Sequence, residues 1–111
     1  MLERRIRPVP AVSRAIAILR LLGRVRTPLG EIDLVASKGA MLIFVEVKSR
    51  KTFEAALEAV TPETRRRIEQ AARLWVARKR TVQNWLWRFD VVLLAPGRLP
   101  RHMPDAWRAG E

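Results

Sequence analysis

Apolar residues follow two kinds of pattern along the chain, and each predicts a different element. Residues 32–36, 41–47 and 89–95 are apolar at nearly every position, which is typical of strands covered on both faces. The segment Ser37-Lys38-Gly39-Ala40 separates the first two runs and predicts a hairpin between them. We therefore expect these strands in the middle of a covered sheet.

Helical spacing of apolar residues predicts three helices. One covers residues 11–22 and ends at Gly23, and a short one covers 53–59 after a Thr52 cap. The longest runs from Pro62 to Lys79, because proline is favoured at the first helical position. Its inward stripe is expected to be Ile68, Ala71, Ala72, Trp75 and Val76. The pattern predicts one α/β domain over residues 11–107, after a loose basic segment 1–10 and before a tail 108–111.

The charge of the chain favours a phosphate-bearing partner. The formal net charge is +11, and 18 of the 22 basic residues are arginine. Arginine presents a planar fork that matches phosphate oxygens in pairs. Genome composition is an alternative source of the arginines, and charge alone does not separate DNA from RNA or an anionic membrane.

The rarest residue types narrow the chemistry. The chain has no cysteine and one histidine, His102, which excludes thiolate zinc sites, disulfides and multi-histidine metal cages. A divalent metal would be held by carboxylates, which suits Mg²⁺ or Mn²⁺. The apolar run 15–22 is short, is interrupted by Arg20 and lacks a following cleavage site, so we expect a cytoplasmic protein without a membrane partner.

Two acidic residues, Asp33 and Glu46, interrupt the first two apolar strands. A carboxylate inside a sheet is costly unless a cation or hydrogen-bond donors compensate it. If the hairpin turns symmetrically about Lys38 and Gly39, Asp33 faces Phe44 and becomes a diagonal neighbour of Glu46. Lys48 then lies on the same face.

Two carboxylates and a lysine suit metal-assisted phosphodiester hydrolysis. Asp33 and Glu46 would hold Mg²⁺ together with the backbone carbonyl of Val47, and Lys48 would orient water or stabilise charge on the phosphate. The simpler alternative is a structural ion pair between Glu46 and Lys48. The predicted contacts to nucleic acid are basic residues on either side of this site, namely Arg50, Lys51, Arg65, Arg66 and Arg73.

Six ordered blocks of sequence resemble the YraN (UPF0102) family of bacterial endonuclease-like proteins, over roughly residues 29–107. They are Gly30-Glu31-Ile32-Asp33-Leu34, Phe44-Val45-Glu46-Val47-Lys48-Ser49-Arg50, Glu58-Ala59-Val60, Ala71-Ala72-Arg73-Leu74-Trp75, Arg88-Phe89-Asp90-Val91-Val92 and Pro104-Asp105-Ala106-Trp107. The resemblance implies a restriction-endonuclease-like fold, with a central mixed sheet flanked by helices. It also implies that Asp33, Glu46 and Lys48 match the metal and catalytic motif of that superfamily. A homodimer is implied only by analogy with resolvases of related fold.

The N-terminal part departs from the family pattern. Val12 stands where family members carry a glutamate, and only residues 24–26 remain where the family has a strand. This predicts a shortened N-terminal part, a sheet without an edge strand and a metal site short of one ligand. Three functions stay open: a Mg²⁺-dependent DNA endonuclease, a catalytically silent nucleic-acid-binding module, and a basic adaptor for acidic proteins.

Six other positions have simpler interpretations. Trp85, Trp87 and Phe89 alternate, which favours packing on one strand face over base stacking. Asp90 is expected to pair with a nearby arginine, and His102 to be a surface group in a Pro/Arg-rich tail. Glu31 is expected to cap local amides, with a place in the metal shell as the alternative.

Overall fold

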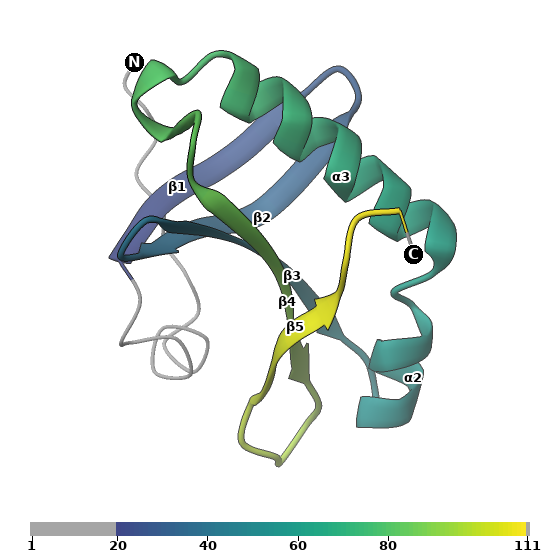
Figure 1. Ribbon diagram of the computed structural model, residues 1–111. Helices are drawn as coiled ribbons and strands as arrows, with labels where there is room; N and C mark the ends of the chain where they lie inside the picture. Colours follow the sequence, from purple (N-terminus) through teal and green to yellow (C-terminus); the bar gives the residue numbers. More distant parts are fainter. Residues whose placement is uncertain (1–19, 111) are drawn as a thin grey trace.

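The computed structural model describes residues 20–110, which form a five-stranded mixed sheet and two helices (Figure 1). The strands lie in the order β1 (Arg20–Thr27), β2 (Gly30–Lys38), β3 (Met41–Ser49), β4 (Leu86–Leu94) and β5 (Arg101–Trp107). Neighbouring strands are antiparallel except β3 and β4. The parallel pair is joined by a crossover through α2 (Phe53–Glu58), α3 (Pro62–Ala77) and the 3-10 turn η1 (Arg80–Val82). This arrangement agrees with the predicted restriction-endonuclease-like α/β fold.

Both helices begin where the sequence predicts, because each has a threonine cap. The Thr52 hydroxyl accepts a hydrogen bond from the amide of Ala55, and the Thr61 hydroxyl accepts one from the amide of Thr64. Each bond satisfies an amide that the first turn of a helix leaves free. Pro62 follows the second cap directly, as expected.

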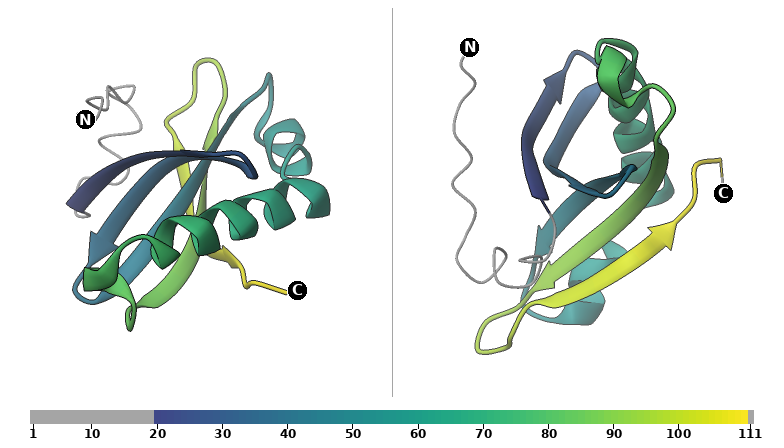
Figure 2. Two further views of the ribbon diagram at one scale, coloured as in Figure 1. Left: turned by 90° about the horizontal axis from the view of Figure 1, so that it is seen from above. Right: turned by 60° about the vertical axis from the view of Figure 1, so that its left-hand side comes forward.

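The sheet is buried on both faces, as its apolar strands predict. The helices cover one face (Figures 1 and 2). On this face Phe44 stacks on Phe89 at 5.5 Å and Phe89 stacks on Trp107 at 4.9 Å between ring centroids. Trp87 also packs into this core, which confirms its predicted packing role. A second buried cluster lies on the other face and consists of Leu34, Ala36, Ile43, Val45 and Val92.

The N-terminal prediction was wrong in one respect. Residues 20–22 belong to β1 and are not helical, and β1 supplies the edge strand that we expected to be missing. Residues 11–19 of the predicted helix lie outside the described residues. The helical spacing of Leu19 and Leu22 was misleading. β1 pairs irregularly with β2 and only its Val25 is buried, so the strand lacks the alternating apolar pattern that would have indicated it.

The β2–β3 hairpin turns one residue later than predicted, which shifts the cross-strand pairing by two residues. Lys38 pairs with Met41, so the turn consists of Gly39 and Ala40 alone, with Gly39 at φ 59°. Glycine adopts this left-handed conformation without steric cost. A shift of two residues keeps every side chain on its face, because side chains alternate with period two.

Gly30 allows α3 to approach the start of β2. A β-carbon at Gly30 would lie 3.3 Å from the carbonyl oxygen of Arg67, and Gly30 has φ 156°. Both observations favour glycine at this crossing of helix and strand. None of the helices between residues 20 and 110 is long and apolar enough to cross a membrane.

Candidate metal and phosphate site

The acidic pair lies where β2 and β3 separate. The ladder between these strands ends at the pair Leu34–Val45, so Asp33 and Glu46 are the first residues beyond it. From there β2 continues toward the β1–β2 turn and β3 toward α2 (Figure 1). Strands that separate leave backbone groups without a ladder partner, and side chains can take their place.

A β-bulge sets the position of Asp33. Gly23 pairs with Val35 and Val25 pairs with Ile32, so Arg24 alone faces both Asp33 and Leu34. Bulges of this kind redirect a side chain at the edge of a ladder. Here Oδ2 of Asp33 accepts a 2.8 Å hydrogen bond from the amide of Val47, across the opening between the strands.

Glu46 is buried beside Asp33 and Lys48. Glu46 is only 7% exposed, and its Oε2 lies 3.0 Å from Nζ of Lys48. Burial and the neighbouring charge of Asp33, with a hydrogen bond between the two carboxyl groups, raise the pKa of Glu46 to about 7, although Lys48 opposes the shift. Two carboxyl groups in such contact can both bind one divalent cation.

The structure therefore brings the predicted residues Asp33, Glu46, Val47 and Lys48 to one place. The predicted register set Asp33 opposite Phe44, whereas the observed register, continued one step beyond the pair Leu34–Val45, sets it opposite Glu46. Glu31 does not join them: it is exposed and lies 4.0 Å from Arg26 on β1. Between residues 20 and 110 no group of three acidic, histidine or cysteine side chains could surround a metal, so this site offers two carboxylates.

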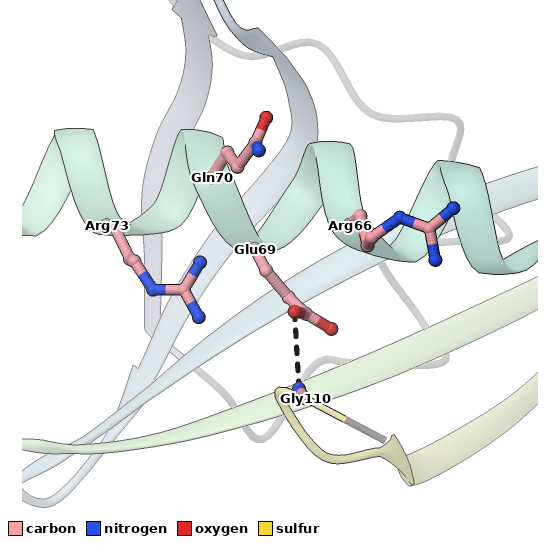
Figure 3. A pocket seen from close by; sticks show the side chains of 5 residues that line it. All are labelled: Arg66, Glu69, Gln70, Arg73 and Gly110. Atoms are coloured by element: carbon pink, nitrogen blue, oxygen red, sulfur yellow. Dashed lines mark hydrogen bonds between the residues drawn. The ribbon is translucent and has the colours of Figure 1, made fainter.

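The predicted phosphate contacts fall in two regions. Arg50 and Lys51 are exposed and directly follow β3, close to Lys48. Arg66 and Arg73 are exposed on α3 and line a hollow of about 290 Å³ around Glu69 (Figure 3). Arg65 differs, because its guanidinium lies 5.6 Å from the centre of the Trp107 ring and its Nε is buried without a hydrogen-bond partner in the described part of the chain.

Glu69 is a buried acid that the sequence analysis missed. One carboxylate oxygen accepts a 2.9 Å hydrogen bond from Nε1 of Trp107, and the other lies 3.4 Å from the amide of Gly110 (Figure 3). Glu69 thereby links α3 to the segment between Trp107 and Gly110. Its position beside the predicted stripe residue Ile68 was the only available signal, since polar residues on a helix usually face solvent.

Asp90 forms a second buried polar cluster between β4 and β5. Its carboxylate accepts two 2.8 Å hydrogen bonds from Arg88 and one of 2.9 Å from the amide of Asp105, and it lies 2.7 Å from Nε2 of His102. Burial would raise the pKa of Asp90, but the hydrogen bonds outweigh burial and hold the pKa below its ordinary value. The predicted pairing of Asp90 with an arginine is confirmed, whereas His102 is half-buried in β5 and not a free surface group.

Sequence comparison identifies the family of the chain. The model of "Uncharacterised protein family UPF0102" matches residues 15–94, which include the whole acidic pair and Lys48. The chain belongs to the UPF0102 family. This confirms the resemblance to the YraN family that the six sequence blocks indicated.

Bacterial members of UPF0102 are similar to the chain over most of its length. UPF0102 protein amb4503 of Paramagnetospirillum magneticum is 56% identical over 79 residues, which are 71% of this chain and 61% of that protein. A UPF0102 protein of Caulobacter vibrioides is 52% identical over 89 residues, or 79% of this chain and 71% of that protein. BCAN_A0183 of Brucella canis is 51% identical over 87 residues, or 78% and 69%. The chain thus spans about 60–70% of these UPF0102 relatives.

Proposed function

We propose that the chain is a Mg²⁺- or Mn²⁺-dependent DNA endonuclease whose site consists of Asp33, Glu46 and Lys48. The observation that carries this proposal is the buried contact between two carboxyl groups with a lysine 3.0 Å from one of them. A structural ion pair would need one carboxylate, whereas here burial and then the charge of the second carboxylate raise the pKa of Glu46 to about 7, at a cost to stability. Groups held in an unfavourable charge state are concentrated at functional sites.

The donor set fits a hard divalent cation. Mg²⁺ is usually held by one or two carboxylates and keeps several water ligands. Asp33 and Glu46 would hold it, with the carbonyl of Val47 as the proposed third protein ligand. When bound, the ion would supply a Lewis acid that polarises the phosphodiester and lowers the pKa of an attacking water.

Lys48 supports the same chemistry from the protein side. Its ammonium is anchored by Glu46 and is partly exposed, with 23% of the side chain accessible. A positive charge fixed in this way stabilises the negative charge that develops on the phosphate during hydrolysis. The Val47 amide holds the carboxylate of Asp33 in place, which reduces the motion of the pair before substrate arrives.

Arginine and lysine side chains would hold the nucleic-acid backbone. Arg50 and Lys51 lie next to the site, and Arg66 and Arg73 are exposed on α3. Each neutralised phosphate contributes to binding in a salt-dependent manner. Arg65 is a weaker candidate than the others, since its Nε is buried and its guanidinium packs on Trp107.

A catalytically silent nucleic-acid-binding module is the second candidate. The observation in its favour is that only two carboxylates meet among the described residues. The sequence resemblance also places Val12 where family members are expected to carry a glutamate. Such a protein would keep the basic surfaces and bind DNA without cutting it.

Cleavage assays separate these two functions. Labelled duplex, single-stranded and four-way-junction DNA would be incubated with Mg²⁺ or Mn²⁺ and the wild type, Asp33→Ala or Lys48→Ala. We expect metal-dependent cutting by the wild type and its loss in both variants. Glu31→Gln is the matched control, because this exposed acid lies on β2 two residues from Asp33 and outside the site.

If the wild type binds DNA in a salt-sensitive manner and does not cut with either metal, the silent module is correct and the endonuclease proposal is wrong. Cutting that persists in Asp33→Ala would also contradict the proposed site.

A further inference from the structure

The β4–β5 hairpin ends in an exposed leucine between two arginines. Leu99 is 83% exposed, more than the other large apolar residues that are exposed in the described chain, and Arg98 and Arg101 are exposed on either side of it. Pro96 and Pro100 restrict the backbone of this tip, and the amide of Arg98 donates a 3.2 Å hydrogen bond to the carbonyl of Ala95. The side chain of Leu99 is thus presented on a short, constrained turn.

The tip lies at the same end of the sheet as the proposed site. Lys48 pairs with Leu93 and Leu93 pairs with Arg101, so these residues form one row across β3, β4 and β5. Two strand spacings separate Lys48 from Arg101, or about 10 Å between backbones. Figure 1 shows the hairpin projecting beyond the sheet on the side of α2.

Contacts tie the tip to the segment that follows β3. The guanidinium of Arg98 lies 4.7 Å from the centre of the Phe53 ring, at the start of α2. The amide of Arg50 donates a 3.1 Å hydrogen bond to the carbonyl of Leu94. The tip therefore keeps a fixed position relative to Lys48 and the basic residues after it.

The charge of this end of the molecule selects a polyanion. Residues 47–53 and 95–101 contain five basic residues and no acidic one, namely Lys48, Arg50, Lys51, Arg98 and Arg101. An apolar protein partner would leave the arginines and Lys51 without counterparts, and a purely acidic surface would leave Leu99 without an apolar contact. Nucleic acid offers phosphates for the arginines and stacked bases for an apolar side chain.

We propose that the hairpin tip is a wedge that inserts Leu99 between bases, while Arg98 and Arg101 contact the flanking phosphates. This inference rests on the proposed function and adds a substrate class to it: duplex DNA interrupted by a nick, a gap or a branch. Inserting an apolar side chain requires a base step to unstack, and an interrupted step unstacks at the smallest cost. The substrate would then extend from Lys48 along the row to Arg101.

The test measures binding without metal, so it does not depend on catalysis. Full-length protein would be titrated into duplex DNA and into gapped DNA with 2-aminopurine beside the gap, in the presence of EDTA. We expect the wild type to bind the gapped DNA more tightly and to raise the 2-aminopurine fluorescence, which reports unstacking. Leu99→Ala should weaken binding to gapped DNA about tenfold and abolish the fluorescence rise. Arg101→Ala should lower the slope of log affinity against log salt by about 1.

Leu86→Ala is the matched control. Leu86 is 72% exposed but lies at the opposite end of β4, so this variant should bind gapped DNA like the wild type. The wedge is wrong if the wild type binds gapped DNA and Leu99→Ala binds equally well with the same fluorescence rise. It is also wrong if no DNA is bound, a result that would remove the nucleic-acid partner itself. DNA binding that requires Leu99 but is never followed by cutting would support the wedge and contradict only the endonuclease activity.

Discussion

The amide of Val47 donates a 2.8 Å hydrogen bond to Oδ2 of Asp33, and this bond joins the two strands just beyond the end of their ladder. A carboxylate here replaces a backbone carbonyl as the acceptor. It thereby places a second negative charge next to Glu46, which the protein would avoid if stability alone were selected.

The raised pKa of Glu46 makes the stability of the metal-free protein depend on pH. The native state favours the protonated carboxyl, so the stabilisation is complete below the unfolded pKa of 4.5 and is lost as pH rises through about 7. Glu46→Gln should remove this dependence and be about 1–3 kcal/mol more stable than the wild type near pH 8. Urea unfolding in EDTA at several pH values measures the effect. A wild type whose stability rises steadily from pH 5 to about 8 would contradict it.

Lys48 should lower the pH at which Glu46 loses its proton. The ammonium favours the charged carboxylate, so Lys48→Met should raise the pKa of Glu46 further. The midpoint of the pH-dependent loss of stability would move to higher pH in the same urea experiments. Lys38→Met is the matched control, since Lys38 is exposed at the hairpin turn, and an equal shift in both variants would show that net charge causes it.

The Asp90 cluster should be a major source of stability. Asp90→Asn removes the charge that Arg88 pairs with while leaving the shape unchanged, and should cost about 2–4 kcal/mol of unfolding free energy. Because its pKa is lowered, the contribution of Asp90 is present above the unfolded pKa of 3.8 and is lost as pH falls through the native value. Thermal and urea unfolding near neutral pH provide the measurement.

Asp105→Asn is the control for Asp90→Asn. Asp105 contributes its backbone amide to the cluster, and its own side chain is exposed. It has φ 52°, a conformation that asparagine tolerates as well as aspartate. The change should stay within about 0.5 kcal/mol. Equal losses in both variants would mean that the buried ion pair is not the cause.

The arginines of α3 should divide into two groups. Arg66→Ala and Arg73→Ala should each lower the salt slope of DNA binding by about 1 with little change in stability, because both side chains are exposed. Arg65→Ala should instead lower stability by about 0.5–1.5 kcal/mol, because it removes the contact with Trp107. Fluorescence anisotropy at several salt concentrations, paired with urea unfolding, distinguishes the two. This grouping of the α3 arginines is wrong if Arg65→Ala lowers the salt slope of DNA binding and Arg66→Ala and Arg73→Ala do not.

Local patterns predicted the central elements correctly because local chemistry determines them. Thr52 and Thr61 cap helices through contacts three residues away, and the strands around Phe44 and Phe89 are apolar throughout. The pair Asp33 and Glu46 was predicted despite a wrong register, since an error of two residues leaves both side chains on their faces.

The edge strands β1 and β5 were missed because contacts with residues distant in the sequence stabilise them, whereas their own sequences show no clear strand pattern. β5 contains Pro104, a residue that favours loops or edge strands, and it is held by the remote acids Asp90 and Glu69. β1 contains Gly23 and follows an apolar stretch with helical spacing. The bulge that places Asp33 depends on pairing with β1, so the sequence could indicate the acids without indicating their contact with Val47.

The most direct test of the metal site is a calorimetric titration of Mn²⁺ into the wild type, Asp33→Asn and Glu31→Gln near pH 8. At this pH Glu46 is largely ionised, so proton release does not mask metal binding. We expect one Mn²⁺ per chain in the wild type and in Glu31→Gln, and none in Asp33→Asn. Binding that survives unchanged in Asp33→Asn, or a wild type that binds no Mn²⁺ even in the millimolar range, would contradict the account.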